Sequence, residues 1–296
     1  MLPFFPASRF SLKESERMGA GDEEAMGKRE KREEFNVIGT APKMGEEEVR
    51  MVEEILGYRF GNKDLVEEAL THGSFYLPYK PAKSYERLEF MGDAVLTCIV
   101  AREVFSSYPD LSPGPLTRLR AANVDTEKLA RVAVEHGLHR YLRHKAPQLE
   151  AQIQDFMQAM MEYPIHSNGL VDPPKVLADI VESLLGAVFL DTNSSLETVC
   201  EIFRRLAAPL INPETLGKHP MSELYELCQK LKMDVTFLKG VWPENPKIDV
   251  LVDGKLVGSG NGQKKEIAQN RAAKAALDRL KETLGDLDST TLDHPD

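Results

Sequence analysis

The sequence predicts an all-α domain followed by a small α+β domain with the element order α-β-β-β-α. From residue 47 to about 211, apolar residues recur at helical spacing without convincing strand alternation. A stretch containing Pro and Gly at 212–218 interrupts this pattern and is typical of a linker. One helical segment, three strand-like segments and one long helical segment then fit within 219–284. We therefore expect two separate domains.

The expected helices of the first domain follow one another closely. An amphipathic pattern covers 47–64 and ends in the turn-like sequence GYRFGNK. The later helical segments are LVEEALTH, SYERLEFMGDAVLTCIVAREVF, LTRLRAANVDTEKLARVAVEHGL, PQLEAQIQDFMQAMM, PKVLADIVESLLGAVFLD and LETVCEIFRRLAAPLI. In the second domain, MSELYELCQKLK and KKEIAQNRAAKAALDRLKE are helical, and DVTFLKGVW, KIDVLVDG and KLVGSGNG alternate like strands.

Both ends of the chain are expected to be disordered. Residues 1–46 are rich in Glu, Lys, Gly and Met without a sustained apolar period, and 285–296 is acidic and polar. The basic run KREKR at 28–32 is either a nuclear address or part of a solvated tail. We expect a nuclear or cytoplasmic protein, and an organellar transit peptide is the alternative.

Composition limits the kinds of function that are possible. The 296 residues include 42% hydrophobic and 28% charged residues, as in soluble domains with real cores. The net charge of −10 argues against binding nucleic acid by bulk charge, so any such contact must use a local basic face. The three cysteines show no CxxC spacing, so we expect neither a disulfide framework nor a zinc site. No apolar run approaches the roughly 20 residues of a membrane span.

Two groups of acidic residues lie within otherwise apolar helices. Glu86, Glu89 and Asp93 are spaced by three and four residues and share one helical face. Asp179 and Glu182 form a second group, three residues apart. Like charges in apolar surroundings are costly unless a cation compensates them. Carboxylates without His or Cys favour Mg²⁺ or Mn²⁺, which supports phosphodiester chemistry. Pairing with nearby Arg and Lys remains the alternative at this point.

Three segments resemble the ribonuclease III family. ERLEFMGDAVL at 86–96 resembles its signature helix, which usually reads ERLEFLGD. LGYRFGNKDLVEEALTHGSF at 56–75 resembles its opening helices, and LADIVESLLGAVFLD at 177–191 resembles its second signature. The matches occur in the family's order. In appearance the chain is closest to plant ribonuclease III-like proteins, which combine one catalytic domain with one double-stranded-RNA-binding domain.

The resemblance assigns roles to matching acids. Glu89, Asp93, Asp179 and Glu182 match the metal-binding positions, with Mg²⁺ as the expected cofactor and Mn²⁺ as a substitute. Asp93 and Glu182 match the positions most often assigned the catalytic role. Glu86 matches an auxiliary acid that helps to shape the site.

The resemblance also implies a reaction and an assembly. Lys175 resembles a basic catalytic-site position that contacts phosphate, and a solvated first-turn residue is the alternative. The implied reaction is metal-dependent hydrolysis of double-stranded RNA that leaves 5′-phosphate and 3′-hydroxyl ends. Because each catalytic domain of the family cuts one strand, this chain should form a homodimer or a heterodimer with a related chain. The stretch 144–174 is longer than in compact bacterial members, and a lid, a partner surface and mere elaboration are all open.

The second domain resembles a double-stranded-RNA-binding domain. Lys264 and Lys265 would meet phosphates at the start of its last helix. Glu223 and Gln229 lie on its first helix, where minor-groove contacts are expected. Ala268 falls where a third basic residue is common, so we expect weaker binding than in a strong family member. A degenerate domain that serves dimerisation is the alternative.

The implied function is an endoribonuclease that acts on double-stranded RNA. The rival is a catalytically silent double-stranded-RNA-binding or heterodimerising regulator that keeps the fold. An inactive member would usually have lost an acid, so the intact set of acids favours the enzyme.

Overall fold

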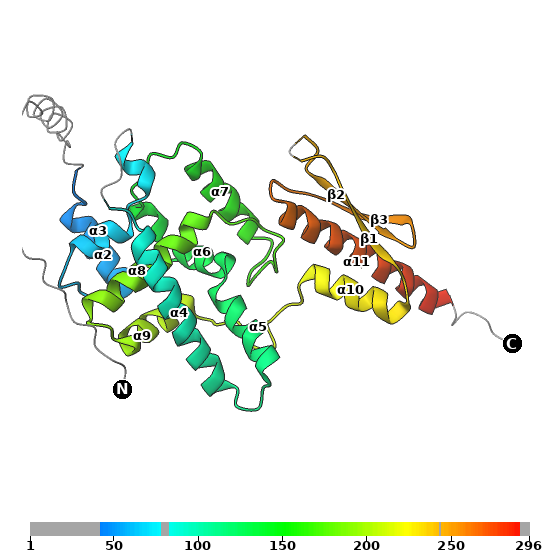
Figure 1. The fold of residues 1–296 in the computed structure, drawn as a ribbon, viewed down its shortest axis with the longest axis horizontal. Helices are drawn as coiled ribbons and strands as arrows, with labels where there is room; N and C mark the ends of the chain where they lie inside the picture. Colours follow the sequence, from blue (N-terminus) through cyan, green and yellow to red (C-terminus); the bar gives the residue numbers. More distant parts are fainter. Residues whose placement is uncertain (1–41, 78–82, 243, 291–296) are drawn as a thin grey trace, which may run out of the picture. The chain divides into compact units, whose positions relative to one another are not determined.

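The computed structural model describes residues 42–77, 83–242 and 244–290, with side chains up to 284, and the predicted fold class is confirmed (Figure 1). The first domain is helical. Its elements are α2 (Glu46–Leu56), α3 (Asp64–Ala69), η2 (Gly73–Tyr76), α4 (Glu86–Ser107), α5 (Pro113–Val124), α6 (Thr126–Glu135), η3 (Leu138–Tyr141), α7 (Leu149–Met160), α8 (Lys175–Asp191) and α9 (Leu196–Ala207). The basic run at 28–32 lies outside the described residues.

Local sequence signals set several helix boundaries. Helix α5 begins with Pro113, whose ring fixes φ near the helical value and whose missing N–H would have had no partner there. Asp125 ends α5 and caps α6 by accepting a 2.7 Å hydrogen bond from the Lys128 amide. The single helical pattern expected across this region is therefore two helices. Ser195 caps α9 in the same way through the Thr198 amide.

Helix α8 is the centre of the helical domain. It is apolar on most sides, as expected for a helix that is buried all round, and Leu177, Ile180 and Leu185 are fully buried. Helix α4 lies along it, and α3, α6 and α9 also pack against it (Figure 1). The two helices that carry the acidic groups are therefore each other's main neighbours.

Two glycines allow the backbones of α4 and α8 to touch. A Cβ atom on Gly92 would lie 1.8 Å from the backbone oxygen of Glu182, and one on Gly186 would lie 2.2 Å from the backbone oxygen of Leu88. Both distances are far inside van der Waals contact. Only glycine at these positions permits this approach, which brings the acidic faces of both helices together.

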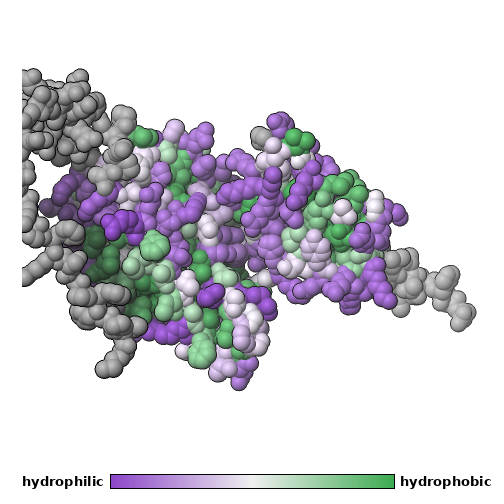
Figure 2. Space-filling view, in the orientation of Figure 1, coloured by the Kyte–Doolittle hydropathy of each residue, from purple (hydrophilic) through white to green (hydrophobic). Residues whose placement is uncertain are grey.

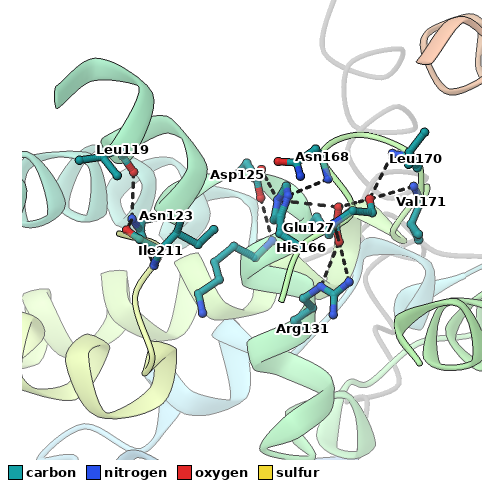
Figure 3. Close-up of polar contacts among 12 residues, drawn as sticks. Leu119, Asn123, Asp125, Glu127, Arg131, His166, Asn168, Leu170, Val171 and Ile211 are labelled. Atoms are coloured by element: carbon teal, nitrogen blue, oxygen red, sulfur yellow. Dashed lines mark hydrogen bonds and ion pairs between the residues drawn. The ribbon is translucent and has the colours of Figure 1, made fainter. Parts of the chain in front are cut away.

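The 144–174 stretch is attached to the helical core. Leu149, Ile153 and Phe156 of α7 are buried in it. The polar contacts beyond α7 involve Glu127, whose side chain contacts Arg131 in Figure 3. The carboxylate of Glu127 accepts hydrogen bonds from the amide of Ser167, at 2.8 Å, and from Arg131 Nη2, at 2.7 Å. This stretch is thus part of the domain's packing.

Removing the Glu127 carboxylate should destabilise the helical domain. Glu127 and Arg131 side chains are 5% and 3% exposed, so Glu127→Ala leaves a buried guanidinium without its partner. We expect the free energy of unfolding to fall by about 3–5 kcal/mol in urea titrations. Glu47→Ala, which removes the exposed Arg50 pair, is the control and should leave the urea titration nearly unchanged. Equal losses in the two variants would contradict a role for the buried network.

The second domain contains α10 (Pro220–Leu231), a three-stranded sheet and α11 (Lys265–Thr290). Strands β1 (Val235–Lys239), β2 (Lys247–Val252) and β3 (Lys255–Asn261) are antiparallel in the order β1-β2-β3. Both residues of the Asp253-Gly254 turn have positive φ, as a two-residue hairpin requires. Apolar residues of α10, α11 and the sheet form this domain's core.

The last helix of the chain extends further than we predicted. Helix α11 continues to Thr290, so the segment 285–296, for which we predicted disorder, begins as helix. Once a helix has formed, adding residues to its end costs little, and this outweighs the polar composition. All three cysteines are free. Within the described ranges, no helix has the length and apolar character needed to cross a membrane.

Candidate active site

Three carboxylates from the two central helices converge. Glu89 comes from α4, and Asp179 and Glu182 come from α8. One oxygen of each lies within 4.8 Å of the others. Asp179 is buried, while Glu89 and Glu182 are half-buried. Such a group of oxygen ligands, without His or Cys, suits a hard divalent cation.

The other two predicted acids line the same hollow. Asp93 and Glu86 are exposed on α4, and both border the hollow beside the three carboxylates. Neither belongs to the group whose oxygens lie within 4.8 Å of one another. Glu86 accepts a 3.2 Å hydrogen bond from Ser84 Oγ. The assignment of Asp93 as a metal ligand and of Glu86 as an auxiliary acid therefore stays a prediction.

The environment of Glu182 strongly favours its protonated form. Burial raises the pKa of Glu182 to about 8, and the negative charges of Asp93, Asp179 and Glu89 add to this effect. Burial and like charges that shift a carboxyl pKa this far are frequent at functional sites. A divalent cation would reverse this preference by compensating the charges.

A buried tyrosine fixes the orientation of Asp179. Tyr85 precedes α4, and its hydroxyl donates a 3.0 Å hydrogen bond to Asp179 Oδ2. Burial, followed by the charge of Asp179, raises the pKa of the Tyr85 hydroxyl well above its usual value. Tyr85 therefore remains a hydrogen-bond donor at all physiological pH values. It leaves Oδ1 of Asp179 for a cation.

In this structure the positive group beside Asp179 Oδ1 is the ammonium of Lys175. The ammonium Nζ lies 2.7 Å from Glu89 Oε1 and 2.5 Å from Asp179 Oδ1. Although 67% of the side chain is exposed, the charge is not simply solvated. The acids raise the pKa of Lys175 despite the opposing effect of partial burial. The ammonium group is therefore ion-paired at the start of α8, and its contact with phosphate stays a prediction.

Sequence reasoning missed three residues that position the site. Gly92 and Gly186 were part of the recognised motifs but received no role, although a glycine inside an apolar helix is a recognisable sign of close packing. Tyr85 gave no signal, because nothing in its spacing connects it with Asp179, 94 positions away.

The predicted phosphate-binding lysines both have partners within the chain. Lys264 Nζ donates to Asp172 Oδ1 at 2.6 Å in a largely exposed ion pair. The Lys265 ammonium lies 5.9 Å from the centre of the Trp242 ring. Exposed pairs of this kind are worth about 1 kcal/mol or less, so RNA phosphates could replace them.

The two predicted contacts on the first helix of the second domain differ in exposure, since Glu223 is half-buried and Gln229 is exposed. Glu223 lies on α10 and accepts a 2.7 Å hydrogen bond from Lys281, and Gln229 is exposed near the end of the same helix. Ala268 is fully buried in the domain core. A position buried in the core does not face RNA, so the expectation that a basic residue belongs at Ala268 is wrong, and its absence says nothing about the strength of RNA binding.

Comparisons with known proteins agree with the geometry. The Ribonuclease III domain model matches residues 86–193, and the Double-stranded RNA binding motif matches 220–280. Ribonuclease 3-like protein 3 of Oryza sativa subsp. japonica is 64% identical over 248 residues, which cover 83% of each chain. The chain belongs to the ribonuclease III family. It is a ribonuclease III-type endoribonuclease.

More distant relatives of this ribonuclease III chain are also found. Ribonuclease 3-like protein 2 of Arabidopsis thaliana is 42% identical over 242 residues, covering 80% of this chain and 61% of that protein. Among solved structures, the nuclease domain of a ribonuclease III from Campylobacter jejuni is similar at 28% identity with a TM-score of 0.43. The similarity covers 55% of this chain and 97% of the Campylobacter jejuni chain.

Proposed function

We propose that this chain hydrolyses double-stranded RNA with divalent cations and leaves 5′-phosphate and 3′-hydroxyl ends. Mg²⁺ is the proposed cofactor and Mn²⁺ its substitute. The observation that carries the proposal is the convergence of Glu89, Asp179 and Glu182 within 4.8 Å. The convergence of these carboxylates does not support the alternative of a catalytically silent regulator. Clustered carboxylates destabilise the fold, and a purely structural role gives no reason to bring them together.

The residues present fit a divalent cation. The donors are all carboxylate oxygens, and a positive group, the Lys175 ammonium, lies between two of them. Glu89, Asp179 and Glu182 would hold the ion, with Asp93 at the edge of the same hollow. When bound, such an ion supplies positive charge for the phosphoryl oxygens and lowers the pKa of water.

The chain's own residues prepare this site. Tyr85 holds Asp179 in one orientation, so part of the positioning is complete before any ligand binds. Burial and the neighbouring acids favour a proton on Glu182 near neutral pH, and a divalent cation held by this group would favour the charged carboxylate instead. Helices α4 and α8 fix these groups more rigidly than loops would.

The second domain would supply most of the grip on RNA. Lys264 and Lys265 mark the start of α11, and Glu223 and Gln229 lie on α10. An A-form duplex would be recognised by its shape and its 2′-hydroxyls. Binding through this local face would allow the chain to hold RNA although its net charge is −10.

We also propose that two copies of the chain form the working enzyme, with a related chain as the alternative partner. One acidic cluster would cut one strand, so cutting both strands of a duplex would require two clusters. Phe90 and Phe105 of α4 are 78% and 71% exposed. An apolar hollow with Phe105, Leu116 and Pro113 lies between α4 and α5. Figure 2 shows hydrophobic residues among hydrophilic ones in this region. Burying such side chains would favour association.

Cleavage of a long RNA duplex tests the proposal. The full chain should cut the duplex with Mg²⁺ or Mn²⁺ and leave it intact with EDTA, and single-stranded RNA of the same sequence should survive. Product ends should accept ligation without prior phosphorylation. Sedimentation of the same preparation should show a dimer. An intact duplex in Mg²⁺ and Mn²⁺ would contradict the enzyme and favour the regulator.

A further inference from the structure

Both oxygens of Asp179 are already occupied. Oδ2 accepts from the Tyr85 hydroxyl, and Oδ1 accepts from the Lys175 ammonium. The same ammonium contacts Glu89, so it bridges two of the three clustered carboxylates. A divalent cation that uses Glu89 and Asp179 would therefore meet the Lys175 charge at the same place.

The Lys175 ammonium has space outside the acid cluster into which it could move. It is the first residue of α8, and 67% of its side chain is exposed. A second hollow, lined by His72, Gln148 and Gln152, also borders Lys175. The flexible four-carbon stem can swing the ammonium out of the acid cluster without moving the helix.

We propose that Lys175 is a built-in counter-ion, which holds the place of the divalent cation and is displaced when that cation binds. The inference rests on the proposed metal-dependent function. In the metal-free chain the ammonium lowers the repulsion among Glu89, Asp179 and Glu182, so the site keeps its shape. The same contacts oppose metal binding, because two positive charges compete for one set of oxygens.

Mn²⁺ titration by calorimetry on the full-length chain tests this competition directly. Lys175→Met removes the charge and keeps a similar apolar stem. It should bind Mn²⁺ about tenfold more tightly than the wild type, since the metal no longer has to break the two contacts. In EDTA the same variant should melt about 2–4 °C lower, because the acids lose their counter-ion. Lys175→Arg keeps a cation and should stay within about threefold of the wild-type affinity.

A matched control lies in the second domain. Lys274 pairs with Asp278 four residues later at 2.5 Å, as Lys175 does with Asp179. Lys274→Met should leave Mn²⁺ affinity unchanged. Equal or weaker Mn²⁺ binding by Lys175→Met than by the wild type would overturn the counter-ion role alone. If neither chain binds Mn²⁺, both this role and the proposed metal chemistry fail.

Discussion

Glu182→Gln should abolish most RNA cleavage while making the metal-free protein more stable. The substitution preserves the size of a side chain that belongs to the carboxylate cluster but removes its charge. We expect the cleavage rate at saturating Mg²⁺ to fall roughly 10³-fold, as when a single electrostatic group of an active site is removed. Single-turnover cleavage of a labelled duplex measures this loss.

The gain in stability follows from the raised pKa of Glu182. In the folded chain the pKa is about 8, against an ordinary value of 4.5, so the folded state holds the proton more tightly than the unfolded state. The associated stability is fully present below pH 4.5 and is lost as the pH rises towards 8. Glutamine avoids this loss. At pH 7 in EDTA, Glu182→Gln should be about 2 kcal/mol more stable, after allowance for solvent screening of the partly exposed carboxyl group.

Melting curves at several pH values distinguish a stability gain caused by the Glu182 pKa from a stability gain that does not depend on pH. The advantage of Glu182→Gln should shrink as the pH falls from 8 to about 5. Glu201→Gln changes an exposed glutamate of α9 and should alter neither cleavage nor melting noticeably. A Glu182 variant that cuts RNA like the wild type, or that melts lower at pH 7, would contradict the assignment.

Much of the acidic site was predictable from the sequence, because the spacing of the acids along each helix places them on one face. Spacings of three and four residues place Glu89 with Asp93, and Asp179 with Glu182, on single helical faces. Spacing does not reveal which faces of two helices meet, because that depends on packing. The family resemblance supplied that step, and the contact between α4 and α8 agrees with it.

The partners of the acids were harder to predict. Nothing local distinguishes a lysine that reaches into solvent from one that turns back onto an acid four residues later, so the role of Lys175 stayed open. Tyr85 lies far from Asp179 in the sequence, and only the fold brings them together. The boundary at Asp125 was missed because apolar periodicity continues across it, while its capping hydrogen bond depends on backbone geometry.

Gly92→Ala should damage both the fold and the site, since this glycine sets the distance between α4 and α8. The added methyl group would lie 1.8 Å from the backbone oxygen of Glu182, and a backbone atom cannot rotate away. The helices must separate, and we expect the free energy of unfolding to fall by about 3 kcal/mol. A displacement of about 1 Å between the acids should lower cleavage roughly 10²-fold or more, even where the protein is fully folded. Urea titration and single-turnover cleavage at low temperature measure the two effects separately.

Gly114→Ala shows what the same substitution does without a clash. Gly114 also lies in a helix, α5, but the nearest atom to a new Cβ is the flexible end of Arg118 at 3.8 Å. Because alanine favours helix, this variant should be unchanged or up to about 1 kcal/mol more stable, with normal cleavage. Gly186→Ala, whose methyl group would meet the Leu88 backbone oxygen, should instead resemble Gly92→Ala. If Gly92→Ala were as stable and active as Gly114→Ala, close backbone contact would not be what brings the acids of α4 and α8 together.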